Sequence, residues 1–415
     1  MLTPGPLNIL WISPKWPNPP IDGARLASFQ LLKGLAPLAN IDMILIAEDP
    51  QCQIPSPDLL LNNVWAIQKP PKNNIWQSLW LYLIHFLKHP KIPLTTASFF
   101  HPQCKRQLAK VMDEIQKSAK HYHYMIIDGM HPSAIFYQDD NFQWPSFVSK
   151  IAYRAHNIEA LLWPQAAAME KNIIKKILLY WQASLVKVFE HKLLKNSNLA
   201  LPISSEDLEI IKKDHPKLPT FMLPMIPDFR PTPLPLPEGK ALKLLFLGRL
   251  DWPPNRQGLL WFLKHVWPKV VQKRKDIQLI IAGSGSLDFK AKYEHLPQVD
   301  WRGFAPSITP LFEESIVLLV PVFFGSGTRI KILESCAHGR AVLSTSFAVQ
   351  GSMLQNEHFI KADTEEEWAQ QICSVNVGNW EKIGHNAYNF LRERINNATV
   401  MYNLQQFLKS KVSDL

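Results

Sequence analysis

The chain has little cysteine and little glycine for its length. Its 4 cysteines, Cys52, Cys104, Cys336 and Cys373, lie far apart and form neither a CxxC pair nor a metal-binding pattern. This spacing argues against a disulfide framework and favours a reducing compartment, so the cytoplasm is the expected location. Glycine, at 16, is outnumbered by proline, at 34, which indicates stiff connections between elements.

Segments that would direct the chain into or across a membrane are also absent from the sequence. Residues 1–6 have no charged n-region, and the apolar run 9–13 is too short for a signal peptide. The longest apolar stretch, 75–87, is interrupted by polar residues and is too short to span a bilayer. We therefore expect a cytoplasmic protein that is either free or bound at the inner face of the membrane.

The composition is that of a globular protein with a basic surface. With 415 residues, 47% hydrophobic and 19% charged, the chain is long enough for two or three domains. A net charge of +10 favours anionic partners such as phosphorylated ligands, an anionic membrane or nucleic acid, although a solvated lysine-rich surface carries the same charge. Because no RNP-like, zinc-finger or helix-turn-helix pattern is present, we expect no nucleic-acid partner.

The first half alternates strand and helix patterns, which is typical of a parallel α/β sheet. A buried strand over 7–13 precedes a proline-rich loop and a predicted helix over 26–38. Further strands are predicted over 41–47, 125–128, 150–154 and 199–204. These patterns predict a first Rossmann-like domain over residues 1–223.

A proline-rich stretch separates the two halves. Residues 224–240 contain six prolines and are predicted to form a semi-rigid linker. Beyond it the alternation resumes, with a helix over 256–273. The predicted strands are 242–248, 277–282, 299–302, 316–321 and 341–345. We expect a second doubly wound, Rossmann-like domain over 241–395 and a final helical segment over 396–415.

In the second half, glycine follows each of four predicted strands. The four loops are Gly248-Arg249, Gly283-Ser284-Gly285, Gly303-Phe304 and Gly325-Ser326-Gly327. Ligands of doubly wound sheets bind outside the carboxyl ends of the strands. Four such loops in succession therefore favour a pocket for a nucleotide diphosphate.

The last of these loops leads into a helix that carries a carboxylate. Backbone N–H groups of the turn 325–327 and the N-terminus of the helix point toward one place, which suits a phosphate. Glu334 lies one helical turn after Ile330, near the apolar face, where a sugar or ribose diol would satisfy its charge. The alternative is an ordinary β-turn-α with Glu334 packed against a loop.

The order of these motifs resembles that of the retaining glycosyltransferases of family 4, which have the GT-B fold. The segments that carry the resemblance are FLGRLDWPPN (246–255), LIIAGSG (279–285), VDWRGF (299–304), GSGTRIKILE (325–334) and SCAHGRAVLST (335–345). The resemblance is strong over 242–352 and looser in the first half. The form of the motifs over 325–345 is similar to that of a branch of the family linked to exopolysaccharide synthesis.

The resemblance implies a fold and indicates which domain binds which substrate. Two Rossmann-like doubly wound domains would face each other across a cleft, with the acceptor on the N-terminal domain and the nucleotide sugar on the C-terminal one. The final segment, 396–415, would cross back to the first domain.

The resemblance also implies roles for individual residues. His156 matches the position of the family's active-site histidine, and Glu334 would hydrogen-bond the ribose hydroxyls. Together with Arg249, which would assist at the diphosphate, these are the predicted catalytic residues. Glu159 either orients His156 or begins the next helix. The predicted donor-binding residues are Gly23, Arg25, Gly248, Arg249, Gly283, Gly303, Phe304, Gly325, Ser326, Gly327, Thr328, Arg329, Lys331 and Glu334.

Two positions depart from the family pattern. Ser326 replaces the first of two glutamates, which leaves the donor sugar open, and Pro254 replaces a lysine that usually follows the Gly-Arg pair. The candidates for the missing cation are Arg256, Arg329 and Lys331, of which we favour Arg329 because it begins the helix. Two cations and oriented N–H groups would stabilise a leaving diphosphate, so neither a metal nor another cofactor is expected.

Two helices of the first half bear on the acceptor. Large apolar residues repeat at helical spacing over 76–87, just before basic residues at 88–91. This helix either rests on an anionic bilayer, where it would present a lipid-linked acceptor, or packs against the core. Residues 171–195 carry lysines all round and are predicted to form a scaffold helix.

The sequence thus predicts a metal-independent, retaining glycosyltransferase of cell-surface polysaccharide synthesis. It would move a sugar from a nucleotide-sugar donor to a glycan or lipid-linked acceptor. Two alternatives stay open: a non-catalytic GT-B partner in a glycan-assembly complex, which the two departures would suit, and a sugar-nucleotide epimerase. The motifs specify neither the base, the sugar nor the acceptor.

Overall fold

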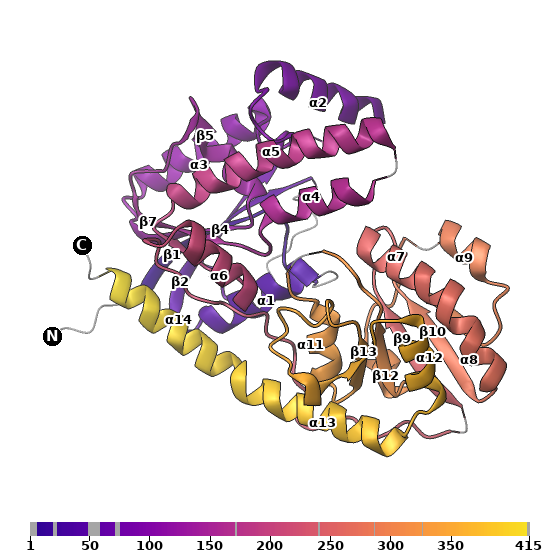
Figure 1. The fold of residues 1–415 in the computed structure, drawn as a ribbon. Coiled ribbons are helices and arrows are strands. Elements are labelled where there is room, and N and C mark those ends of the chain that lie inside the picture. The colour runs from indigo at the N-terminus through magenta and orange to yellow at the C-terminus, as the bar shows by residue number, and fades with distance from the viewer. Residues whose placement is uncertain are drawn as a thin grey trace. The chain divides into compact units, whose positions relative to one another are not determined.

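The chain folds into two compact units (Figure 1). The structure is a computed structural model that describes residues 6–19, 23–48, 59–70, 75–170, 172–239, 241–285, 287–325 and 327–412. Unit 1 comprises Met1–Pro224 and Asn397–Leu415, and unit 2 comprises Met225–Asn396. Each unit is built around its own parallel sheet, which confirms the predicted α/β class.

Unit 1 contains a six-stranded parallel sheet in the order β3-β2-β1-β4-β7-β8. Its strands are β1 (Leu7–Ser13), β2 (Ala39–Ala47), β3 (Asn63–Gln68), β4 (Tyr122–Asp128), β7 (Val148–Arg154) and β8 (Leu199–Ala200). A separate small hairpin pairs β5 (Tyr137–Gln138) with β6 (Asn141–Phe142). Its α-helices are α1 (Gly23–Leu35), α2 (Ile75–Lys88), α3 (Pro102–Lys117), α4 (Glu159–Met169), α5 (Ile173–Lys195), α6 (Ser205–Asp214) and α14 (Asn397–Val412).

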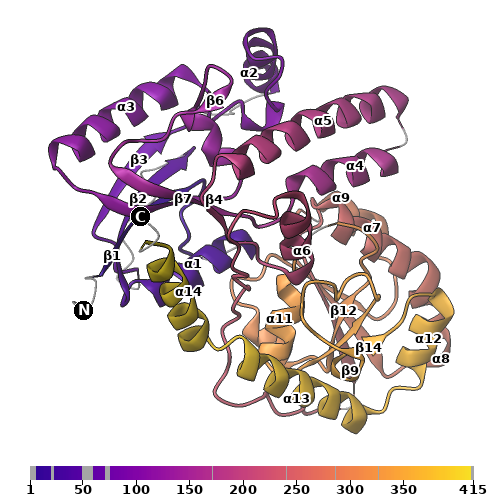
Figure 2. The ribbon, with the colours of Figure 1, turned by 60° about the vertical axis from the view of Figure 1, so that its left-hand side comes forward.

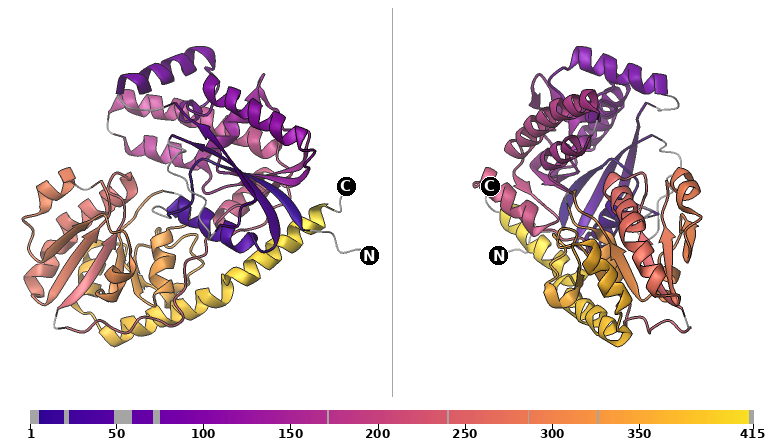
Figure 3. Two further views of the ribbon diagram at one scale, coloured as in Figure 1. Left: turned by 180° about the vertical axis from the view of Figure 1, so that it is seen from behind. Right: turned by 45° about the vertical axis from the view of Figure 1, so that its right-hand side comes forward.

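Helices cover both faces of this sheet because its central strands are apolar on both sides (Figure 3). Leu10 and Ile12 of β1 belong to the core that α3 and α5 close. On the other face, the Tyr124 hydroxyl of β4 donates a hydrogen bond to the Leu408 carbonyl of α14 at 2.7 Å. α14 also contacts α1, and the Gln405 amide donates to the Leu38 carbonyl, just after α1, at 2.8 Å.

Unit 2 repeats this architecture with the order β11-β10-β9-β12-β13-β14 (Figure 2). Its strands are β9 (Leu242–Leu247), β10 (Ile277–Ala282), β11 (Val299–Gly303), β12 (Val317–Val320), β13 (Ala341–Ser344) and β14 (Ile360–Lys361). Its α-helices are α7 (Pro253–Trp261), α8 (Trp267–Lys273), α9 (Leu287–Tyr293), α10 (Thr309–Glu313), α11 (Ile330–Ala337), α12 (Glu365–Cys373) and α13 (Val377–Arg394).

Two predicted elements differ in the structure, and an edge strand was not predicted. The helix predicted over 256–273 is divided into α7 and α8 by a π-helical stretch, Phe262–Val266, because Pro268 has no N–H to continue the regular bonding pattern. The strand predicted over 199–204 pairs only at Leu199–Ala200. β3 was not predicted, since it lies at the sheet edge and most of its side chains are exposed.

The proline-rich segment after Pro224 is attached to unit 2 along its length. The buried Arg340 guanidinium donates to the Leu234 and Pro235 carbonyls at 2.9 and 2.6 Å. The Tyr388 hydroxyl donates to the Arg230 carbonyl at 2.7 Å. The segment is thus held in place by side chains of the folded unit rather than only by the stiffness of its prolines.

α2 lies on the surface of unit 1. Of the described side chains over 80–88, only that of His85 is buried, while Trp80 and Leu87 are among the most exposed large apolar residues. The alternative that α2 packs against the core is therefore wrong for its exposed residues Trp80, Leu83 and Leu87. Among the helices that the structure describes, none is both long and apolar enough to cross a bilayer.

Candidate active site

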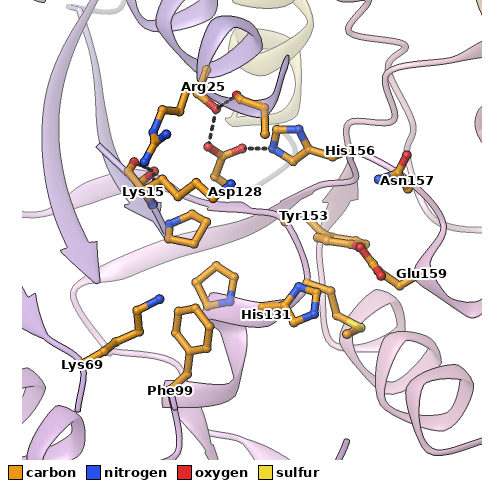
Figure 4. A pocket seen from close by; sticks show the side chains of 17 residues that line it. Lys15, Arg25, Lys69, Phe99, Asp128, His131, Tyr153, His156, Asn157 and Glu159 are labelled. Carbon is orange, nitrogen blue, oxygen red and sulfur yellow. Dashed lines mark hydrogen bonds and ion pairs between the residues drawn. The ribbon is translucent and has the colours of Figure 1, made fainter. Parts of the chain in front are cut away.

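Unit 1 has a pocket at the carboxyl ends of β1, β4 and β7. This is the point where the strand order reverses between β1 and β4, the usual ligand position in a doubly wound sheet. The pocket has a volume of about 400 Å³ and is lined by the loops after these strands, by the start of α1, and by Lys69 and Phe99 (Figure 4). Its charged and polar lining includes Lys15, Arg25, Lys69, Asp128, His131 and His156.

A buried polar cluster forms the floor of the pocket. Residues Asp128 and Arg154 end neighbouring strands and are paired in the sheet register. Arg154 Nη1 and His156 Nε2 both lie 2.6 Å from Asp128 Oδ1, and Ser28 Oγ donates to Oδ2 at 2.6 Å. Asp128 and Arg154 are only 2% and 1% exposed, so their charges pair away from solvent.

Asp128 fixes the tautomer of His156. Arg154 Nη1 lies 3.0 Å from His156 Nε2, but the Asp128 carboxylate is closer at 2.6 Å. Because an ionised carboxylate only accepts hydrogen bonds, His156 Nε2 carries the proton and, in the neutral ring, Nδ1 holds the lone pair. Burial alone would raise the pKa of Asp128, but the charges of Arg154 and His156 and the hydrogen bonds from His156 and Ser28 hold it well below its usual range. His156 therefore faces a permanently charged carboxylate at neutral pH.

Glu159 does not orient His156, because it is the first residue of α4 and the hydrogen-bonded carboxylate beside His156 is Asp128. Glu190 of α5 caps α4 instead, accepting from the backbone N–H groups of Glu159 and Ala160 at 3.2 and 2.8 Å. The Tyr153 hydroxyl also donates to Glu190 at 2.8 Å. Burial raises the pKa of both Glu159 and Glu190 to about 7.

The structure brings Arg25 and His156 into the same pocket (Figure 4). Gly23 is the first residue of α1, two positions before Arg25. Arg25 Nε donates to the Trp16 carbonyl at 3.1 Å, which ties the start of α1 to the loop after β1.

In unit 2, the loops after β9 and β10 touch through their glycines. A Cβ at Gly283, where φ is +147°, would lie 1.9 Å from the Gly248 carbonyl oxygen. Only glycine therefore fits at Gly283. Arg249, next to Gly248, is half-exposed and pairs with Asp251, which an anionic ligand would have to displace.

Lys331 reaches the same loop from α11. Its Nζ donates to Asn255 Oδ1 at 2.8 Å, and Asn255 Nδ2 donates to the Arg249 carbonyl at 3.0 Å. Arg329, which the sequence favoured as the second cation, instead donates to the Gly327 carbonyl at 2.8 Å and lies over the Phe347 ring. Thus Lys331, rather than Arg329, lies beside Gly248 and Arg249.

Glu334 and Lys331 form a pair with strongly shifted pKa values. Burial raises the pKa of Glu334 to about 7, with Lys331 acting in the opposite direction. Burial and the charge of Arg329 lower the pKa of Lys331 to about 7, against the effect of Glu334. Within the described part of the chain, no hydrogen bond or ion pair engages the Glu334 carboxylate.

The remaining predicted residues lie in the neighbouring loops. Thr328 Oγ1 donates to the Gly351 carbonyl at 2.9 Å, and Gly325 and Gly327 both have positive φ. Gly303 ends β11, and Phe304 after it is 56% exposed. Ser326 lies outside the described residues.

The sequence did not single out Asp128, Arg154, Ser28 or Lys69 as site residues. Asp128 and Arg154 were each visible as a charged residue that ends a predicted strand. The pairing of Asp128 with Arg154 depends on the register of β4 and β7, and the contact of Asp128 with Ser28 depends on where α1 packs.

Comparisons with known proteins agree with this architecture. The structure is similar to that of HepE from Anabaena in complex with UDP and glucose, with a TM-score of 0.64 and 14% identity, covering 97% of this chain and 100% of that one. Two doubly wound units with this likeness define a GT-B fold, as the sequence predicted.

Residues 241–376 match the family described as Glycosyl transferases group 1. This segment lies within unit 2 and is similar to the group 1 glycosyl transferases. This segment includes Arg249, Lys331 and Glu334.

Two curated relatives match over parts of the chain. An uncharacterized 44.6 kDa protein in the cps region of Klebsiella pneumoniae is 25% identical over 260 residues, which are 60% of this chain and 65% of that protein. A phosphatidyl-myo-inositol mannosyltransferase of Mycobacterium tuberculosis is 34% identical over 116 residues, which are 26% and 28% of the two chains. The chain thus spans less than two thirds of either relative.

Proposed function

We propose that this protein is a retaining glycosyltransferase of family 4 that uses a nucleotide-sugar donor. The observation that carries the proposal is the arrangement at the strand ends of unit 2. There Lys331 lies beside Gly248 and Arg249, and the Glu334 carboxylate follows one turn later on the same helix. The segment that matches the group 1 family contains all four residues.

The proposed chemistry follows from charge. Cleavage of a glycosyl–phosphate bond builds negative charge on the leaving diphosphate. Lys331 and Arg249 would balance that charge, together with backbone N–H groups near Gly327 and Thr328, so the proposed reaction requires no metal. Glu334 would accept hydrogen bonds from the ribose hydroxyls, which offsets the burial of its charge.

In the same proposal, the pocket of unit 1 holds the acceptor and presents His156 to the transferring sugar. Asp128 fixes the orientation of the His156 ring, so that Nδ1 is the lone-pair nitrogen. Arg25 and Gly23, at the start of α1, would assist at the donor phosphates, as the family resemblance implies.

The donor class and the pathway come from the relatives. HepE was solved with UDP and with UDP-glucose, so we propose uridine nucleotides as the first class to test. The Klebsiella relative is named for a cps region, which supports a role in polysaccharide synthesis. The acceptor would be a glycan or a lipid-linked sugar.

The proposal is tested by thermal unfolding with UDP-, GDP-, ADP- and dTDP-sugars, with and without EDTA. A donor that binds only the folded state raises the melting temperature. We expect one nucleotide class to stabilise the protein regardless of EDTA, and Glu334→Ala to abolish the shift. His156→Ala should keep donor binding but lose transfer. A well-folded protein that no donor stabilises would contradict the proposal and favour a non-catalytic partner.

A further inference from the structure

One side of unit 1 exposes an unusual number of large apolar side chains. On α2, Trp80 is 61% exposed and Leu87 is 69% exposed. Leu83, Ile84 and Phe86 on the same helix are each more than two fifths exposed. Isolated apolar residues are common on protein surfaces, but five within two helical turns are not.

The first turns of α5 continue this exposure. Ile173 and Ile174 are both 67% exposed, Ile177 is 61% exposed and Leu178 is 56% exposed. From Gln182 onward the helix packs into the unit and most of its apolar residues are buried. The predicted scaffold role therefore fits only the later part of α5.

The exposed parts of α2 and α5 adjoin each other. The Phe86 and Trp181 rings meet edge to face with centroids 5.6 Å apart. Figures 1 and 3 show α2 alongside α5 on the same side of unit 1. We name the exposed apolar side chains of 80–87 and 173–180 the α2–α5 surface.

The charged residues of α2, and those of α5 before Glu190, are all basic. The sequence has no acidic residue between Asp58 and Asp113, and none between Glu170 and Glu190. The same two stretches contain ten lysines and one arginine. A surface that combines apolar side chains with cations, and carries Trp and Tyr among them, has the composition of an interfacial membrane-binding face.

We propose that the α2–α5 surface docks unit 1 on an anionic lipid bilayer. A second copy of the chain would suit this surface poorly, because a symmetric contact would bring the lysines of α2 and α5 close to their own copies. An anionic bilayer instead accepts the apolar side chains between its headgroups and attracts each lysine. The proposal deepens the proposed function, because a bilayer-bound unit 1 would meet lipid-linked acceptors where they reside.

The test is cosedimentation of the full chain with phosphatidylcholine vesicles, made with or without phosphatidylglycerol. We expect tighter binding to the phosphatidylglycerol vesicles, weakened by added salt because the lysine contribution is screened. Each lysine near an anionic surface adds to the free energy of membrane binding. Removing two lysines should therefore weaken binding about thirtyfold. Lys175→Ala/Lys176→Ala tests this, and Lys212→Ala/Lys213→Ala on α6 is the matched control, which should bind like the wild type.

The apolar contribution is tested separately. Leu83→Ser/Leu87→Ser and Ile173→Ser/Ile177→Ser should each weaken binding to both kinds of vesicle by at least about tenfold. Tyr402→Ser on α14 removes a side chain that is 58% exposed elsewhere in unit 1 and should leave binding unchanged. Because all these side chains are exposed, the variants should unfold at the wild-type temperature.

Two results would overturn the proposal. One is a wild-type protein that does not bind phosphatidylglycerol vesicles, or variants of the α2–α5 surface that bind as tightly as their controls. The other is a dimer in light scattering that the same variants dissociate, which would assign the surface to a second copy. Vesicle binding needs no donor, so vesicle binding without any donor-induced stabilisation would refute the proposed function while supporting the membrane surface.

Discussion

The substitution Asp128→Asn would separate the charge of the buried cluster from its shape. An asparagine oxygen in place of Oδ1 can still accept from Arg154 and His156, which both contact that atom. The side-chain amide of the asparagine can donate a hydrogen bond to Ser28 Oγ, because a hydroxyl oxygen can also accept. The hydrogen-bond pattern survives, and only the negative charge is lost.

The expected loss of stability is large because Arg154 would remain charged and buried. Removing one partner of a buried ion pair destabilises by about 3–5 kcal/mol. For a domain of the size of unit 1, this lowers the melting temperature by about 6–20 °C. The variant Asp113→Asn makes the same chemical change in an exposed pair with Lys117 and should cost less than about 1 kcal/mol.

Chemical denaturation and transfer kinetics measure the two effects. Asp128→Asn should lower kcat about a hundredfold, because the negative charge beside His156 is lost, while donor affinity stays unchanged. The double variant Asp128→Asn/Arg154→Met should recover part of the lost stability, because no charge is left unpaired. The single and double variants together give the coupling between the two side chains.

The pH dependence gives a further check with a defined sign. The pKa of Asp128 in the folded protein is below its unfolded value of about 3.9, so its contribution is complete above that value. It is lost as pH falls toward the folded pKa. The wild type should therefore lose stability more steeply than Asp128→Asn below about pH 5. Equal stabilities for the wild type and Asp128→Asn at neutral pH would refute the reasoning about the cluster.

Three further outcomes are expected. Gly283→Ala should destabilise unit 2 by more than about 3 kcal/mol in urea unfolding and abolish donor binding, whereas Gly303→Ala, with open space around its Cβ, should cost only about 1–2 kcal/mol. Donor affinity measured by calorimetry should be greatest near pH 7, because Lys331 loses its proton above that pH and Glu334 gains one below it. Lys331→Met should remove the fall above pH 7, and Glu334→Gln the fall below it. Arg340→Met should cost about 3–5 kcal/mol and expose residues 231–239 to proteases, as seen on a denaturing gel, because the buried carbonyls of Phe312 and Leu234 and the partly buried one of Pro235 lose their donor.

The central strands were predictable because they are long apolar runs. β1 matches its predicted range, and β10 does too, since both are buried on two faces and need a continuous hydrophobic sequence. The edge strand β3 escaped prediction because its side chains are mostly exposed and carry no such pattern.

The candidate site was predicted in unit 2 as a set of motifs, and in unit 1 only as His156, Gly23 and Arg25. Glycine-rich loops after strands can be recognised in the sequence, and Glu334 follows one of these loops within the next helix. The preference for Arg329 over Lys331 rested on position in the chain, whereas the direction of each side chain is set by contacts with Phe347 and Asn255. Such contacts between segments that are distant in the chain cannot be predicted from the spacing of residues along the sequence.

The placement of α14 has a consequence for how the protein is made. α14 packs so closely on α1 that a Cβ at Gly34 would lie 2.5 Å from Asn397 Oδ1, and Met401, Leu404 and Leu408 are buried in unit 1. The whole of unit 2 lies between α1 and α14 in the chain. At ribosomal rates of about 5–20 residues per second, α14 is synthesised roughly 10–40 s after the rest of unit 1. Unit 2 can therefore complete its fold first, while the apolar face of α1 stays uncovered on the ribosome and available to chaperones.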